Sequence, residues 1–173
     1  MDQAGKGEKL EAWDWWYYTE KLRKEKYDLE EDQIKPYFKL ENVREGAFAV
    51  ANKLYGITLT KLNNVPVYHP DVEVFEVKDA DGSQLGIFYV DYFPRAGKSG
   101  GAWMSNYREQ KGDIRPLVCN VASFTKPVGD TPSLFTIDEV ETLFHEFGHA
   151  LHGLLTKCNY LGVSGTNVVR DFV

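Results

Sequence analysis

The sequence has few cysteines, no long apolar run and no excess of positive charge, and each shortage argues against a class of protein. Two cysteines among 173 residues, Cys119 and Cys158, cannot form the disulfide framework of a small secreted domain. We expect both to be buried or half-buried thiols in a reducing compartment. No stretch approaches the roughly 20 apolar residues that cross a bilayer, so no membrane span is expected.

The charge balance and the first residues of the chain also argue against a nucleic-acid-binding, membrane-bound or secreted protein. The formal net charge is −6 at pH 7, whereas proteins that bind nucleic acid or anionic membranes usually carry a basic patch. The first residues, MDQAGKGEKL, lack the apolar core of a signal peptide, and no N-x-S/T glycosylation sequon occurs. We therefore predict a cytoplasmic protein without a nucleic-acid or membrane partner, and leave its oligomeric state open.

The remaining composition is that of a globular domain, with 43% hydrophobic and 14% aromatic residues. A chain of this length can bury about 70% of its unfolded surface in one domain. Its patterns predict an α+β fold in which a small antiparallel or mixed sheet packs beside helices. We expect a helical segment (residues 1–56), a sheet segment (57–125) and a long motif helix (136–156).

The helical segment contains two amphipathic stretches. Residues 8–27 place an aromatic cluster, 13–18, at helical spacing, which favours a core position over the alternative, the wall of a peptide groove. Residues 40–55 repeat apolar side chains at helical spacing and end at Gly56, a typical C-terminal cap. Both stretches are expected to bury one face.

The sheet segment shows the alternation of strands. Val72–Val77 and Leu85–Val90 flank the turn residues 79–82, so we predict an antiparallel hairpin that turns at Asp81-Gly82. Residues 117–122 form a further strand, either internal or at an edge where a peptide backbone could pair. Between them, the glycines of residues 97–101 favour a mobile loop.

The most informative pattern is His145-Glu146-Phe147-Gly148-His149, an H-E-x-x-H motif. Thr136 and Glu139 form a capping box upstream, and apolar residues then repeat every three or four positions, which predicts one helix over 137–155. Residues four apart share a helix face, so both imidazoles can reach one zinc ion, with the Glu146 carboxylate beside them. The alternative is a core helix with two incidental histidines. His152 lies about 10 Å along the axis from His145 and is not counted as a ligand.

In this setting the sequence resembles the thimet oligopeptidase family of zinc peptidases, in particular its bacterial peptidyl-dipeptidase and oligopeptidase branch. The string Phe144-His145-Glu146-Phe147-Gly148-His149-Ala150-Leu151-His152 is the most specific part of the resemblance. Further matching segments are Trp13–Tyr18, Val67–Pro70, Gly100–Met104 and Ser164–Asn167.

The resemblance implies a zincin-like, mainly helical peptidase with a deep channel for short peptides, of which this chain is a partial catalytic domain. It also implies a third zinc ligand, a Glu roughly 25 residues after His149 and so just beyond Val173. The groups that stabilise the tetrahedral intermediate are expected further along as well. We therefore expect the parent protein to be active and this fragment to be inactive alone.

The expected activity is zinc-dependent hydrolysis of short peptides, as a peptidyl-dipeptidase or an oligoendopeptidase. Zn²⁺ on His145 and His149 would activate water, and Glu146 would act as general base. One alternative is a non-catalytic peptide-binding module, or pseudoenzyme, that keeps the fold. Another is a structural zinc site, although such sites usually have four closed ligands and the two cysteines lack paired spacing.

Overall fold

A computed structural model describes residues 10–27, 31–169 and 172, and it has the expected α+β architecture. The helices are α1 (Trp15–Tyr27), α2 (Glu31–Ile34), α3 (Leu40–Tyr55) and α4 (Ile137–Leu155). The strands are β1 (Thr58–Leu62), β2 (Glu73–Lys78), β3 (Gln84–Asp91), β4 (Trp103–Arg108) and β5 (Leu117–Val121). Short 3-10 turns cover Ala12–Asp14, Lys35–Tyr37 and Leu161–Val163.

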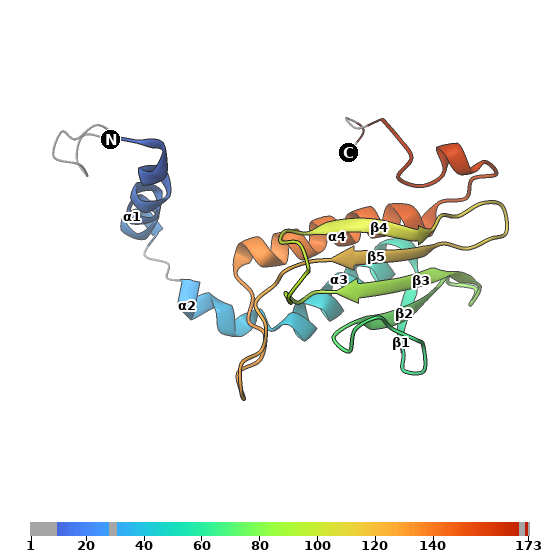
Figure 1. Cartoon of the computed structure of the whole chain (residues 1–173), viewed down its shortest axis with the longest axis horizontal. Coiled ribbons are helices and arrows are strands. Elements are labelled where there is room, and N and C mark those ends of the chain that lie inside the picture. Colours follow the sequence, from blue (N-terminus) through green and yellow to red (C-terminus); the bar gives the residue numbers. More distant parts are fainter. Residues whose placement is uncertain (1–9, 28–30, 170–171, 173) are drawn as a thin grey trace.

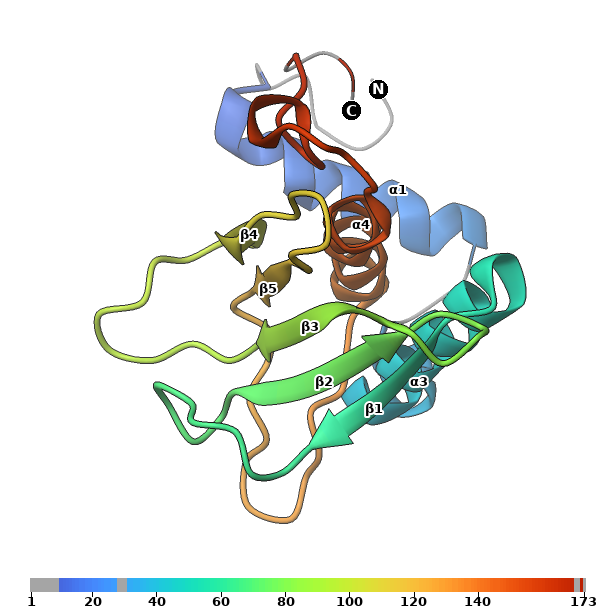
Figure 2. The same ribbon diagram turned by 90° about the vertical axis from the view of Figure 1, so that its right-hand side faces the viewer.

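The five strands form one mixed sheet in the order β1-β2-β3-β5-β4. β3 and β5 are parallel, and the other neighbours are antiparallel. Helices α3 and α4 cover one face of this sheet, as Figures 1 and 2 show from two directions. The long helix therefore lies directly against the strands, which confirms the fold class expected from the sequence.

Aromatic side chains join the helices to the sheet. The ring of Phe147 on α4 lies 5.5 Å from that of Phe48 on α3 and 5.7 Å from that of Phe88 on β3, measured between centroids. Aromatic pairs at such separations contribute about 0.5–1.5 kcal/mol each beyond the area that they bury. All three residues belong to the central hydrophobic core, so α4 is fixed on the sheet through its apolar face.

Two local structures follow the sequence closely. Helix α3 ends as predicted, because Gly56 adopts φ 74° and its N–H donates to the carbonyl of Asn52 at 2.8 Å. The hairpin also forms as predicted, with Val74 opposite Tyr89 in the antiparallel ladder. In its turn, the N–H of Gly82, at φ 85°, donates to the carbonyl of Asp79 at 2.9 Å.

The amino-terminal aromatic cluster does not occupy the predicted position. The expected helix begins later, at Trp15, and residues 1–9 lie outside the described part of the chain. Trp13 and Trp16 are 77% and 78% exposed, so the expectation that they are core residues is wrong for the described structure. Trp16 lies on α1 and Trp13 on the 3-10 turn before it, and α1 stands apart from the sheet (Figure 1).

Several smaller expectations can also be compared. Cys119 is buried and Cys158 half-buried, and both are free thiols, as predicted. Two members of the apolar repeat in residues 40–55, Val50 and Leu54, are exposed, because the core contacts of α3 run through Val43, Ala47 and Ala51. No helix within the described ranges is both long and apolar enough to span a membrane. Asp171, whose residue type could cap a further helix, falls outside the described residues.

Close contact between β3 and α4 depends on Gly86. A Cβ at this position would lie 2.8 Å from Leu154 Cδ2 and 2.9 Å from the backbone oxygen of Pro116, closer than non-bonded atoms normally approach.

We predict that Gly86→Ala lowers the free energy of unfolding by about 1–3 kcal/mol, the usual cost of overpacking. Gly46→Ala is the matched control: nothing lies within 4 Å of its Cβ position in α3, so it should stabilise by up to about 1 kcal/mol. Urea unfolding measures both, and equal stabilities would show that the sheet and helix are not in tight contact there.

Candidate metal centre on helix α4

Helix α4 begins at a fully formed capping box. The Thr136 hydroxyl accepts a hydrogen bond from the Glu139 N–H at 3.1 Å, and the Glu139 carboxylate accepts one from the Thr136 N–H at 2.9 Å. The other oxygen of the same carboxylate accepts from the N–H and hydroxyl of Thr125, at 2.8 and 3.1 Å. Glu139 therefore both starts the helix and anchors the segment that arrives from β5.

The helix extends from Ile137 to Leu155 without a break, as the sequence predicted. Leu143, Phe147 and Leu154 are buried against the sheet and α3, whereas Phe144, expected in the same stripe, is 40% exposed. The stripe is narrower than the sequence suggested because the small residues Ala150 and Gly153 complete the buried face. The opposite face is left for the polar residues of the motif.

His145 and His149 converge on this polar face. Their Nε2 atoms are 3.0 Å apart, and the ring centroids are separated by 4.6 Å with the planes at 86°. Two nitrogens bound to one tetrahedral zinc at 2.0–2.1 Å are about 3.3–3.4 Å apart, so a small side-chain adjustment would admit the ion. The donor type and the spacing both fit zinc.

Glu146 follows His145 and is rotated about 100° around the helix axis, between the histidine face and the buried face. Its side chain is half-buried, as is that of His149, while His145 is exposed. The three motif residues thus lie at the boundary between the core and solvent.

A third ligand is not found in the described part of the chain. No group of three His, Cys, Asp or Glu side chains there could hold a metal ion. His152 is half-buried, and its ring lies 6.2 Å from that of Phe172. The described residues therefore offer two imidazole nitrogens that could bind a metal ion, but not a complete set of ligands.

The strand at the edge of the sheet on the β5 side is β4, and β5 is internal. Strand β5 pairs with β3 on one side and β4 on the other, so of the two alternatives for residues 117–122 the internal strand is confirmed and the free edge is wrong. The sequence left this open because a strand's neighbours cannot be inferred from its own pattern. Strand β4 is also close to the motif helix: a Cβ at Gly153 of α4 would come 2.8 Å from Met104 Cε.

The sequence of the chain can be compared with the sequences of known proteins. The sequence profile of peptidase family M3 matches residues 1–173. The chain belongs to peptidase family M3. This family consists of metallopeptidases, and its match confirms the resemblance found from the motif residues.

The M3 chain is similar to several curated bacterial enzymes. It is 52% identical to the dipeptidyl carboxypeptidase of Salmonella typhimurium over 176 residues, which cover 100% of this chain and 26% of that protein. It is 48% identical to the dipeptidyl carboxypeptidase of Escherichia coli, again over 100% of this chain and 26% of the relative. Oligopeptidase A of Escherichia coli is 41% identical over 94% of this chain and 25% of its own length. The chain thus spans about a quarter of the length of these relatives.

Proposed function

We propose that the protein containing this chain is a zinc peptidase that hydrolyses short peptides, with zinc held by His145 and His149 and with Glu146 as general base. The observation that carries the proposal is the convergence of the two Nε2 atoms, 3.0 Å apart, on the exposed side of a helix with Glu146 beside them. Membership of family M3 supports it. So do relatives named dipeptidyl carboxypeptidase and oligopeptidase A.

Each of the three motif residues has a distinct role in the proposed reaction. A zinc ion held there would lower the pKa of a bound water molecule to about 7 and polarise the scissile carbonyl. Glu146 accepts the proton of the water molecule as its oxygen adds to the carbonyl carbon, and returns that proton to the leaving amine nitrogen as the C–N bond breaks. His145 and His149 act only as ligands, since both are needed neutral for metal binding.

Strand β4 offers a place for the peptide backbone. Its outer side has no partner strand in the described sheet, so backbone N–H and C=O groups are available there. An extended peptide could pair along it, as in other complexes formed by strand addition. Because β4 packs beside α4 at Gly153, such a peptide would run past the motif helix.

A structural zinc site is less consistent with the geometry. Cys119 lies on β5 and alternates with Val118, whose side chain faces α4, so its thiol points to the other face of the sheet. The Cys158 thiol instead contacts Thr156 Oγ1 and the carbonyl of Val163. Neither cysteine reaches the histidine pair to complete a closed site.

The test is metal removal from the full-length gene product. We predict that it cleaves fluorogenic short peptides, that dialysis against 1,10-phenanthroline abolishes cleavage, and that one equivalent of zinc restores it. Hydrolysis that survives complete removal of metal would contradict the proposal. Peptide binding without hydrolysis by the zinc-loaded protein would favour the non-catalytic module instead.

A further inference from the structure

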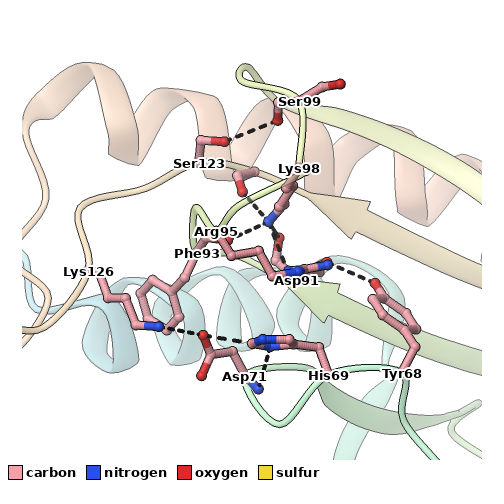
Figure 3. A network of polar contacts seen from close by, with 11 residues as sticks. Tyr68, His69, Asp71, Asp91, Phe93, Arg95, Lys98, Ser99, Ser123 and Lys126 are labelled. Carbon is pink, nitrogen blue, oxygen red and sulfur yellow. Dashed lines mark hydrogen bonds and ion pairs between the residues drawn. The ribbon is translucent and has the colours of Figure 1, made fainter.

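The Lys98 ammonium group is enclosed by oxygen atoms. Its Nζ donates to the backbone carbonyls of Asp91, Phe93 and Ala122 at 2.8, 2.7 and 2.6 Å, and lies 3.0 Å from Asp91 Oδ1 (Figure 3). The side chain is 5% exposed. An ammonium has three N–H groups, so the four acceptors use its whole donor capacity. Lys98 is therefore an internal cation that holds backbone, not a surface charge.

The carboxylate of Asp91 completes this arrangement. It is 1% exposed and also accepts two hydrogen bonds from the Arg95 guanidinium, at 2.7 and 2.9 Å, and one from the Tyr68 hydroxyl at 2.9 Å. Burial alone would raise the pKa of Asp91, but the hydrogen bonds from Arg95, Lys98 and Tyr68 outweigh it and lower the pKa to about 2. The carboxylate is thus ionised at every pH at which the protein would work.

Lys98 connects three parts of the chain that meet near the motif helix. Asp91 is the last residue of β3, Phe93 belongs to the loop that leads to β4, and Ala122 follows β5 on the way to α4. The Ser123 hydroxyl adds a weaker bond to the carbonyl of Ser99, at 3.4 Å. The loop between residues 92 and 102 is therefore tied to the exit of β5 immediately before β4 begins at Trp103.

Arg95 differs from Lys98 in what it holds. In the described part of the chain its guanidinium donates hydrogen bonds to the Asp91 carboxylate and to no backbone carbonyl, and its side chain is 25% exposed. Lys126 also forms an ion pair nearby, with Asp71 at 2.7 Å (Figure 3), but it is 49% exposed, and its contact with the loop before β4 is with the ring of Phe93, whose centroid lies 5.9 Å from Nζ. Of these three cations, Lys98 is the one bonded to the carbonyl that follows β5.

We propose that Lys98, supported by Asp91, is a positioning residue that fixes the start of the edge strand β4 beside the motif helix. Its effect on catalysis rests on the proposed function, because β4 is the strand at which the peptide would pair. The structural part stands independently: without the ammonium, three backbone carbonyls lose a donor and the loop keeps only the weaker Ser123–Ser99 bond to the exit of β5 among the described hydrogen bonds. Strand β4 would then be free to shift relative to α4.

The structural part is tested by hydrogen–deuterium exchange on the 173-residue chain. Lys98→Met, which keeps the aliphatic stem, should accelerate exchange of the β4 amides at least tenfold while leaving the amides of α4 unchanged. Arg95→Met is the matched control, since it also removes a cation from Asp91 but no backbone tie, and should leave β4 protected. Unchanged β4 exchange in Lys98→Met, or equal acceleration in both variants, would overturn the proposal. If Lys98→Met does not fold, Lys98→Gln retains part of the donor capacity and should show the same local pattern.

The catalytic part is tested by steady-state kinetics of the full-length gene product. Lys98→Met should raise KM for short peptides about tenfold, with a smaller change in kcat and unchanged zinc affinity, whereas Arg95→Met should leave KM within about twofold. A merely structural defect would lower the active fraction, and so kcat, without changing KM. If the unmodified protein hydrolyses no peptide, the proposed function fails, while the exchange experiment still decides whether Lys98 positions β4.

Discussion

Replacing Glu146 with glutamine should reduce kcat of the full-length gene product by about 10²–10⁴, the range that a positioned general base contributes. The amide has nearly the same shape as the carboxylate but cannot accept the proton from water. His145 and His149 are unchanged, so zinc affinity should stay within about threefold of the unmodified protein. The combination of lost turnover and retained metal is the expected signature of a base that is not a ligand.

The measurement pairs steady-state kinetics with zinc titration for each variant. Glu141→Gln is the matched control, because Glu141 is an exposed residue of the same helix, outside the motif. It removes the same charge and should leave kcat within about twofold. Full activity of Glu146→Gln would remove Glu146 from the mechanism, and a loss of zinc in that variant would make it a ligand instead.

Local signals in the sequence predicted the elements that carry the site. The Thr136–Glu139 capping box sets the start of α4 without help from distant residues, and the apolar repeat that follows sets its buried face. The pair His145 and His149 then share a face because the helix is continuous through both. Gly56 and Gly82 likewise mark the end of α3 and the hairpin turn, since each adopts a positive φ that glycine tolerates best.

Features that depend on residues distant in the sequence could not be predicted from local sequence patterns. Whether β5 is internal or at an edge depends on where β4 pairs, which the sequence of β5 does not encode. The tie through Lys98 joins residues up to 24 positions apart, and its sequence suggested only a glycine-rich loop. One signal was available: an Asp directly after an apolar strand, followed within seven residues by Arg and Lys, favours a buried ion pair.

The N-terminal aromatic residues show that helical periodicity alone does not predict burial. Trp13 and Trp16 have helical spacing in the sequence, and α1 forms from Trp15 onward with Trp13 on the 3-10 turn before it, yet both rings remain exposed. Periodicity identifies which side chains share a face, but burial requires a second surface, and no described element supplies one. The same reasoning applies to the candidate metal centre, where the helix presents two imidazoles and the proposed zinc site needs further groups.

The 173-residue chain by itself should have a low affinity for zinc. We predict that it binds zinc at least about 100-fold more weakly than the full-length gene product, and that its peptide hydrolysis is near background. The described residues offer two imidazoles where a catalytic zinc usually has three protein ligands. Loss of a partner that only supports a ligand already costs about 10–100-fold, so a missing ligand should cost more.

Calorimetric zinc titration of both proteins measures the difference, and two single substitutions assign the ligands. His149→Ala should abolish specific binding in either protein, because a single imidazole then remains. His152→Ala is the control: its ring lies beside Phe172 instead of joining the His145–His149 pair, so affinity should not change. Tight stoichiometric zinc binding by the 173-residue chain would mean that a residue within it completes the site. A loss of that binding in His152→Ala would identify His152 as the third ligand.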